Sequence, residues 1–229
     1  MKLDREARVA IHYAPQPDDP LWAAGTSWLG RDPLTNEARS QPDFPAIAEI
    51  TADARLYGFH ATLKPPMHLM PETRWEALIQ RAAAVAETIA PFDLPPLAIA
   101  DLFGFLALCE TAPCPPLHAL ADACVAGFDE FRAPPGDAEL ARRRRGGLSA
   151  EREAMLRRWG YPDVFATWVF HMTLTRRLRE PEQAIYRPAA EAHFAPALRV
   201  PRRVSDICLF VQRAPGAPFA IAARTTLRG

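Results

Sequence analysis

Apolar and polar residues alternate along residues 8–14, which is typical of a β-strand with one buried face. Val9, Ile11 and Tyr13 fall on one face of this predicted strand, and His12 falls on the other. Similar apolar runs predict further strands over residues 56–63, 97–108, 168–175, 204–212 and 219–225. Within residues 97–108, either Asp101 or Gly104 is expected to form a turn or bulge.

A helical period is clearest over residues 72–89, where Trp75, Leu78, Ala82 and Val85 fall on one stripe. Other helices are predicted over residues 21–29, 117–131, 149–159 and 180–194, with a basic helical piece at 142–145. Residues 30–53 are polar and interrupted by proline, so a loop with one helical turn is expected there. Strands and helices follow in a similar order in the two halves of the chain, which indicates an α+β fold with an internal duplication.

Two predicted strands carry the same motif, His-x-Thr-Leu, at residues 60–63 and 171–174. Strand alternation places His60, Thr62 and Lys64 on one face, with apolar residues on the other. In the second copy, His171 and Thr173 share a face in the same way. An ordinary structural role is the default for one histidine. Two complete copies among six histidines would arise by chance on the order of once in a few thousand chains.

The paired motifs fit chemistry at a phosphodiester. One imidazole can act as a general base and the other as a general acid near neutral pH, which makes His60 and His171 the candidate catalytic residues. The Thr62 and Thr173 hydroxyls can donate hydrogen bonds to the phosphoryl oxygens, and Lys64 can add a positive charge. Neither a protein nucleophile nor a metal is required, and the sequence does not assign the base and the acid.

Two further positions are candidates for substrate binding. Tyr13 or its neighbour His12 is expected to line the cleft from the first strand. The arginine run at residues 142–145 has two interpretations, a solvated helix face or a source of one side chain, Arg143, that binds a second phosphate. Tyr57 stands three residues before His60, so a regular strand would point it away from the motif face.

Charge and composition narrow the class of protein. The formal net charge is zero, so binding of an anion needs a local cluster of basic residues. The spacing of histidines and cysteines matches no zinc site, and neither a Walker A loop nor a glycine-rich dinucleotide fingerprint is present. We therefore expect neither a metal nor a cofactor.

Compartment follows from the cysteines and the N-terminus. No Cys-x-x-Cys pair occurs, so free thiols in a reducing cytoplasm are expected. The four cysteines are Cys109, Cys114, Cys124 and Cys208. Residues 1–6 are charged and lack the apolar core of a signal peptide, and no apolar run approaches the roughly 20 residues of a membrane helix. A cytoplasmic protein is predicted.

The two motifs resemble those of the 2H phosphoesterase superfamily, which includes 2′-5′ RNA ligase-like proteins and cyclic phosphodiesterases. That resemblance implies a bilobal α+β fold in which two antiparallel sheets face each other across a central cleft, with helices outside. It also implies that His60, Thr62, His171 and Thr173 meet in the cleft and that the substrate is a cyclic phosphate.

A closer resemblance, to the DUF1045 family, extends over nearly the whole chain. It rests on residues 13–15, 28–32, 57–66, 159–162 and 170–174. Members of that family are described as phosphonate metabolism proteins and are associated with carbon–phosphorus lyase operons. The association with these operons implies a ribose cyclic phosphate as substrate.

These observations predict one bilobal domain over residues 1–229, with lobes at about 1–112 and 113–229 and strand exchange between them left open. The predicted function is a metal-independent 2H-type phosphoesterase, a hydrolase of the cyclic phosphodiesterase type that acts on a small phosphate ester. One alternative is a non-catalytic module that binds a nucleotide or phosphorylated sugar. The other is an RNA end-processing phosphodiesterase, against which the neutral net charge counts. The oligomeric state stays open.

Overall fold

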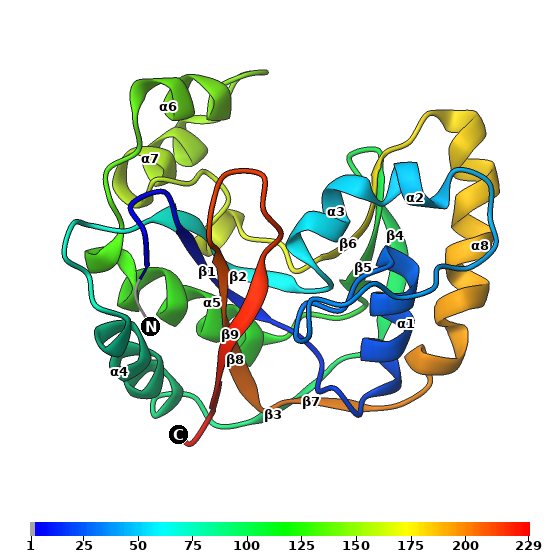
Figure 1. The fold of residues 1–229 in the computed structure, drawn as a ribbon, viewed down its shortest axis with the longest axis horizontal. Helices are drawn as coiled ribbons and strands as arrows, with labels where there is room; N and C mark the ends of the chain where they lie inside the picture. The colour runs from blue at the N-terminus through cyan, green and yellow to red at the C-terminus, as the bar shows by residue number, and fades with distance from the viewer. Residues whose placement is uncertain (1–2) are drawn as a thin grey trace.

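The computed structural model describes residues 3–229, so Met1 and Lys2 of the predicted charged N-terminus lie outside the described residues (Figure 1). The strands are β1 (Arg8–Tyr13), β2 (Ala61–His68), β3 (Phe92–Leu94), β4 (Leu97–Leu102), β5 (Phe105–Glu110), β6 (Met172–Arg177), β7 (Arg202–Val204), β8 (Asp206–Gln212) and β9 (Ala220–Thr226). The α-helices are α1 (Pro20–Leu29), α2 (Ile47–Ile50), α3 (Ala52–Tyr57), α4 (Trp75–Ala86), α5 (Pro115–Gly127), α6 (Asp137–Arg143), α7 (Ala150–Trp159) and α8 (Glu180–Leu198). Short 3-10 turns cover Asp129–Phe131 and Phe165–Thr167.

A single antiparallel sheet organises the fold. Its seven strands run in the order β4-β5-β6-β2-β1-β8-β9, and β3 and β7 form a separate pair. The α+β class is therefore confirmed, whereas the prediction of two sheets that face each other is wrong. The reason is that β2 and β6 pair at Ala61 and Met172, which joins the two halves into one sheet.

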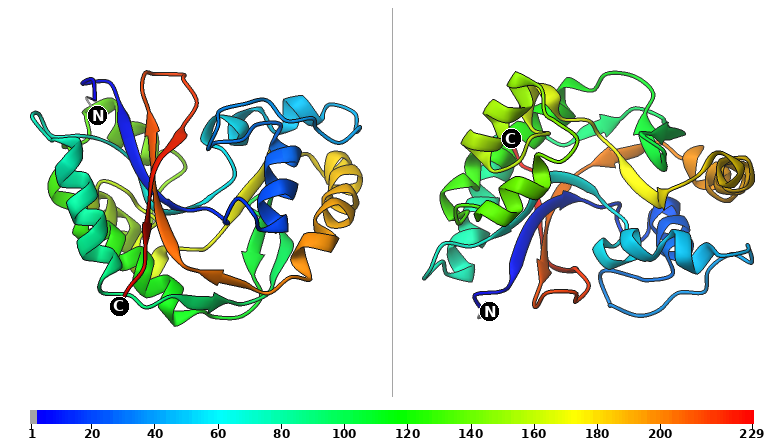
Figure 2. Two further views of the ribbon diagram at one scale, coloured as in Figure 1. Left: turned by 60° about the horizontal axis from the view of Figure 1, so that its bottom comes forward. Right: turned by 90° about the horizontal axis from the view of Figure 1, so that it is seen from above.

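Helices cover the sheet in two groups (Figures 1 and 2). The helices α4 and α5 contact β2, β8 and β9, whereas α1, α2, α3 and α8 contact β4 and β6. The C-terminal hairpin of β8 and β9 joins β1 from the other end of the chain, and β6 joins β5. Because strands from distant parts of the chain alternate in the sheet, the division into lobes at residue 112 stays a prediction.

The first strand is buried on both faces. Val9, Ile11 and Tyr13 belong to the main core, as the alternation predicts. On the other face, Ala10 belongs to a second, smaller apolar cluster, and His12 has no exposed surface. The predicted polar face of this strand is therefore interior, because β8 and its hairpin add a second layer of apolar side chains.

Local structure departs most from the sequence-based expectation just before the first motif. Within residues 30–53, α2 is the expected helical turn, but α3 begins at Ala52 and continues to Tyr57, into the predicted strand. Gly58 then adopts a φ of 80°, a conformation that side chains with a Cβ rarely take, and β2 begins only at Ala61. The turn at Gly58 thus replaces the predicted start of the strand at Leu56.

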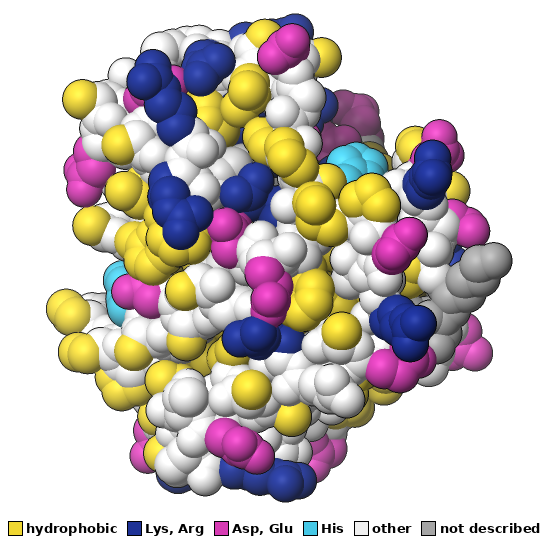
Figure 3. Space-filling model, turned by 90° about the vertical axis from the view of Figure 1, so that its left-hand side faces the viewer, with side chains coloured by type: hydrophobic (Ala, Val, Ile, Leu, Met, Phe, Trp, Pro, Cys, Tyr) yellow, Lys and Arg dark blue, Asp and Glu magenta, His cyan; other side chains and the backbone are white. Residues whose placement is uncertain are grey.

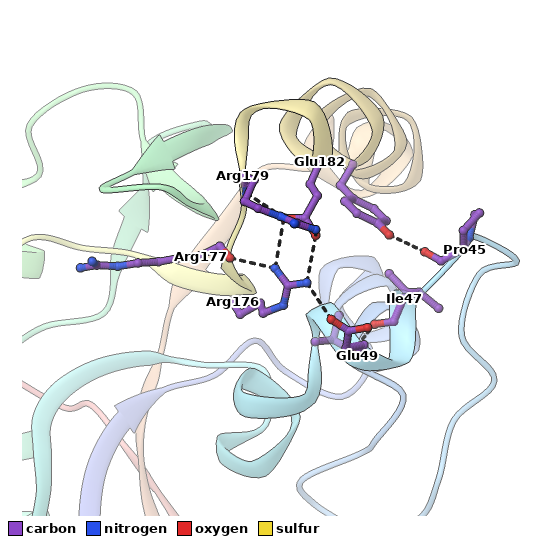
Figure 4. Close-up of polar contacts among 9 residues, drawn as sticks. Pro45, Ile47, Glu49, Arg176, Arg177, Arg179 and Glu182 are labelled. Carbon is purple, nitrogen blue, oxygen red and sulfur yellow. Dashed lines mark hydrogen bonds and ion pairs between the residues drawn. The ribbon is translucent and has the colours of Figure 1, made fainter.

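An ion-pair network holds the end of β6 against two helices (Figure 4). Arg176 donates to Glu49 of α2 at 2.7 Å and to Glu182 of α8 at 2.9 Å. The carboxylate of Glu182 also accepts from the backbone N–H of Arg179 at 2.7 Å, at the start of α8. These contacts lower the pKa of Glu182 to about 2. The strand that carries the second motif is thereby tied to α2 and α8.

Two observations bear on the predicted cellular compartment. All four cysteines are free thiols; Cys114, Cys124 and Cys208 are buried, and Cys109 is partly exposed. Within residues 3–229, no helix combines the length and apolarity that crossing a bilayer demands.

Gly25 provides a test of the packing beneath the first motif. A Cβ added to Gly25 in α1 would lie 2.1 Å from Cδ1 of Phe59, the residue before His60. We expect Gly25→Ala to lower the free energy of unfolding by about 1–3 kcal/mol, because the buried ring cannot move aside without repacking. Thermal or urea unfolding measures the change. Gly136→Ala is the control, since nothing lies within 4 Å of its added Cβ; equal stability losses in both variants contradict the prediction.

Candidate functional site

The two motifs meet at the centre of the sheet. The pair that joins β2 to β6 is Ala61 and Met172, the residues that directly follow His60 and His171. Two indole N–H groups hold the motif strands beside this pair. Trp168 donates to the Thr62 carbonyl at 2.9 Å, and Trp28 donates to the Leu174 carbonyl at 3.0 Å. The strand pairing described between β2 and β6 ends at Ala61 and Met172. The two indole groups therefore supply hydrogen bonds to motif carbonyls beyond this pair.

Both histidines are oriented in the same way. The Nδ1 atom of His60 bonds the Gly58 carbonyl at 2.8 Å, and Nδ1 of His171 bonds the Val169 carbonyl at 2.9 Å. A carbonyl can only accept, so Nδ1 carries the proton in each ring, an assignment made from the hydrogen-bond partner. In the neutral ring, Nε2 is then the acceptor. The Thr62 hydroxyl donates to Nε2 of His60 at 3.2 Å.

Two adjoining cavities flank the motifs. A cavity of about 560 Å³ is lined by His60 and Thr173, and one of about 550 Å³ is lined by His171. Both are also lined by the same four residues, Thr62, Pro65, Arg143 and Tyr161. The structure thus brings together all four motif residues that the sequence singles out, and Arg143 with them.

His60 is held in its neutral form. Burial lowers the pKa of His60 to about 4, against the hydrogen bond to Gly58, which raises it. Electrostatic interactions with His171 and Arg31 lower it further. At neutral pH, His60 therefore presents an unprotonated Nε2 to its cavity and is suited to accept a proton.

His12 lies directly behind His60, a contact that sequence reasoning missed. The two imidazole rings stack with centroids 3.8 Å apart and planes 22° apart. His12 is fully buried and packs against Phe210, and neither of its ring nitrogens has a hydrogen-bond partner among residues 3–229. Burial, together with the neighbouring His60, holds its pKa well below the usual value. The neutral His12 ring thus stacks against the face of the His60 ring.

The predicted contribution of Tyr13 to the cleft needs correction. Only 3% of this residue is exposed, and its ring packs in the main core, 6.4 Å from Phe170. It lies on the face of β1 opposite His12, so it belongs to the layer beneath the sheet. Neither cavity beside the motif histidines is lined by Tyr13.

Lys64 also lies elsewhere than predicted. The pairing of β1 with β2 shifts between Thr62 and Lys64, so a bulge there breaks the alternation. The Lys64 side chain is 2% exposed; its Nζ donates to the Val125 carbonyl at 2.8 Å and lies 3.4 Å from Asp129. Burial lowers the pKa of Lys64 to about 8, although Asp129 opposes the shift. This lysine joins β2 to α5 instead of extending the His60 face.

The arginine run divides between the cavities and a structural ion pair. Arg143 lines both cavities, and its guanidinium lies 4.4 Å from the ring centroid of Tyr161 and pairs with Glu139. Arg142 lines the cavity beside His60, and Arg145 lines the one beside His171. Arg144 instead pairs with Glu153 of α7 at 2.8 Å. Of the two interpretations, the one that brings Arg143 to the cleft agrees with the structure.

Positive charge is concentrated at the cavities. Together they are lined by six arginines and only two aspartates, in a chain whose formal net charge is zero. The arginines are Arg8, Arg142, Arg143, Arg145, Arg152 and Arg177. Figure 3 shows basic side chains, with acidic ones among them, on the upper part of the face that α6 and α7 form. The cavities therefore favour an anionic ligand.

Two tyrosines at the cavities were not predicted. Tyr57 lines the cavity beside His60, with its ring 6.2 Å from the His60 ring. The prediction that it faces away is wrong, because α3 and the turn at Gly58 replace the regular strand. Tyr161 follows α7 and lines both cavities. Among residues 3–229, no three His, Cys, Asp or Glu side chains gather so that they could hold a metal ion.

The chain belongs to the family described as "Protein of unknown function (DUF1045)", whose model matches residues 62–220. The resemblance drawn from the sequence is thereby confirmed at the level of this family. The structure also resembles the crystal structure of E. coli LigT complexed with NADP+, with a TM-score of 0.47 and 13% identity over 99% of this chain and all of that one. A crystal structure titled as a phosphoesterase matches with a TM-score of 0.44 and 15% identity over 98% of this chain and 99% of that one.

Two curated relatives share much higher identity. A protein of Janthinobacterium sp. (strain Marseille) is 42% identical over 221 residues, which cover 93% of this chain and 49% of that protein. A protein of Laribacter hongkongensis (strain HLHK9) is 37% identical over 216 residues, 93% of this chain and 50% of that protein. Both are named ribose 1,5-bisphosphate phosphokinase PhnN. The chain spans about half the length of these relatives.

These names overturn the predicted hydrolase. A phosphokinase transfers a phosphoryl group to an acceptor, so it is a transferase, and hydrolysis of a cyclic phosphate does not follow from the relatives. The motif chemistry could not separate the two classes, because both reactions act at phosphorus and need the same donors around the phosphoryl oxygens. The predicted link to phosphonate metabolism stays a prediction, because the family description assigns no function.

The stacked histidines predict how stability depends on pH. Histidine in the unfolded chain has a pKa near 6.5, whereas fully buried His12 and partly buried His60 both have lower pKa values in the folded protein. Below pH 6.5 the unfolded chain binds protons that the folded chain does not, so the free energy of unfolding falls as pH drops from 7 towards 4. Each histidine contributes at most about 1.4 kcal/mol per pH unit to this slope.

His12→Phe keeps a ring against His60 and removes one titrating group. We expect this variant to lose less stability between pH 7 and pH 5 than the wild type. Urea unfolding at a series of pH values measures both slopes. Parallel curves for the two proteins would show that His12 is protonated alike in the folded and unfolded chains and would contradict the prediction.

Proposed function

We propose that this chain holds a phosphorylated ribose as the acceptor in a phosphoryl-transfer reaction, with ribose 1,5-bisphosphate as the ligand. The observation that carries the proposal is the identity of 42% over 93% of the chain with a protein named ribose 1,5-bisphosphate phosphokinase. The excess of arginine around the two cavities supports it, since a bisphosphorylated sugar carries several negative charges.

Each side chain at the centre of the proposed site has a specific role in binding the sugar phosphate. When the sugar binds, the Thr62 hydroxyl turns from Nε2 of His60 to the phosphoryl oxygens, to which the Thr173 hydroxyl also donates. Arg143 adds a positive charge from the wall that the cavities share. A phosphate monoester has its second pKa near 6. At neutral pH that proton has therefore mostly dissociated, which leaves the acceptor oxygen unprotonated, and neutral His60 can donate no Nε2 proton that would tie up this oxygen. His171 presents Nε2 from the neighbouring cavity.

The phosphoryl donor is assigned to a site outside this chain. Half of each curated relative lies beyond the part that matches this chain. The printed sequence lacks the Walker A pattern, a glycine-rich loop followed by lysine that cradles nucleotide phosphates in many kinases. On this proposal, the chain supplies the acceptor half of the reaction, and the phosphoryl group reaches it from a donor bound elsewhere.

Binding of the acceptor tests the proposal directly. We expect ribose 1,5-bisphosphate to bind the chain without any nucleotide present, as measured by isothermal titration calorimetry. Thr62→Val and Thr173→Val should each weaken binding by about tenfold to a hundredfold, because each loses a hydrogen bond to a charged oxygen.

Thr226→Val is the matched control, since it removes a hydroxyl from the exposed end of β9, a position that lines neither cavity. Its affinity should equal that of the wild type. If ribose 1,5-bisphosphate does not bind, or if all three variants bind it alike, the acceptor site is not in this cleft and the proposal fails.

A further inference from the structure

The cavity beside His171 contains basic side chains that the protein itself leaves unpaired. Four arginines line it, against a single aspartate, Asp163. Two of them have carboxylate partners: Arg152 pairs with Asp163 at 3.0 Å, and Arg143 pairs with Glu139. The other two, Arg145 and Arg177, have no side-chain hydrogen bond or ion pair within residues 3–229.

The two unpaired guanidinium groups come from different parts of the fold. Arg177 ends β6, six residues after His171, whereas Arg145 stands two residues after the end of α6. Arg177 extends away from the ion-pair network that surrounds its neighbour Arg176 (Figure 4). Glu49 and Glu182 neutralise Arg176, yet in the described part of the chain no carboxylate pairs with Arg177. Unpaired guanidinium groups thus line this cavity on two sides, Arg177 from β6 and Arg145 from the segment after α6.

The rest of the lining strengthens the attraction for an anion. Phe103, Phe105 and Trp168 line the same cavity, and such apolar groups lower the local dielectric constant. Phe103 lies in the turn between β4 and β5 and is 69% exposed. Unpaired guanidinium groups beside one cavity repel each other, and a phosphate dianion between them removes the repulsion and accepts bidentate hydrogen bonds.

We propose that this cavity is a second phosphate subsite, in which Arg145 and Arg177 bind the second phosphoryl group of a bisphosphorylated sugar. The first phosphoryl group lies beside His60, Thr62 and Thr173, and the sugar crosses the wall that the two cavities share. This inference rests on the proposed function and adds to it a preference for a bisphosphate over a monophosphate.

The test compares two ligands that differ by one phosphate. Isothermal titration calorimetry at low ionic strength should show that the wild type binds ribose 1,5-bisphosphate about tenfold to a hundredfold more tightly than ribose 5-phosphate. In the double variant Arg145→Gln/Arg177→Gln, the two affinities should agree within about twofold, because the second phosphate loses its charged partners. Binding of ribose 5-phosphate should be unchanged.

A control variant removes the same charge elsewhere. Arg74 precedes α4 and Arg199 follows α8; both are exposed, and neither lines a cavity beside the motif histidines. Arg74→Gln/Arg199→Gln should keep the preference for the bisphosphate. If it loses that preference as fully as the cavity variant does, overall charge explains the selectivity, and the subsite is refuted.

The remaining outcomes separate this inference from the proposed function. Equal wild-type affinities for the two ligands refute the second subsite, and so does a preference that survives Arg145→Gln/Arg177→Gln. In both cases, the proposed acceptor site still stands if Thr62→Val weakens binding of the ligand. If neither ligand binds the wild type, the acceptor site and the second subsite fail together.

Discussion

The pairing of Ala61 with Met172 is the contact on which the site depends. It joins β2 to β6 at the centre of the sheet and, because the strands are antiparallel, sets each histidine across from the threonine of the other motif, His60 with Thr173 and His171 with Thr62. Indole N–H groups of Trp28 and Trp168 bond carbonyls of the two motifs. Backbone pairing thus brings together residues that stand more than 100 positions apart in the chain.

Burial then determines what the two histidines can do. Each Nδ1 bonds the carbonyl of the residue two positions earlier, so both rings have the same tautomer. Only His60 has a fully buried histidine stacked behind it, and its pKa falls to about 4. Two equivalent motifs therefore become different groups, because their surroundings and not their sequences differ. The neutral ring presents an unprotonated Nε2 to its cavity.

Most helices and strands could be predicted from the period of apolar residues, including the strand after His171 and the turn near Gly104. Two motifs of identical form also indicated the central residues of the candidate site. Prediction failed where tertiary packing overrides a local pattern. The bulge after Thr62 turns Lys64 towards α5, and the second apolar layer over β1 buries His12. No residue near Lys64 or His12 in the sequence indicates that these contacts form.

The sequence by itself determined which residues could act at phosphorus, because His and Thr two positions apart share one face of a strand. It did not determine the reaction, since hydrolysis and phosphoryl transfer place the same demands on those side chains. Only the tertiary structure decided that a single sheet carries both motifs and that arginines from α6, β6 and the N-terminal strand surround them. The physical reason is that charge becomes concentrated through contacts between distant segments, which a chain of zero net charge does not reveal.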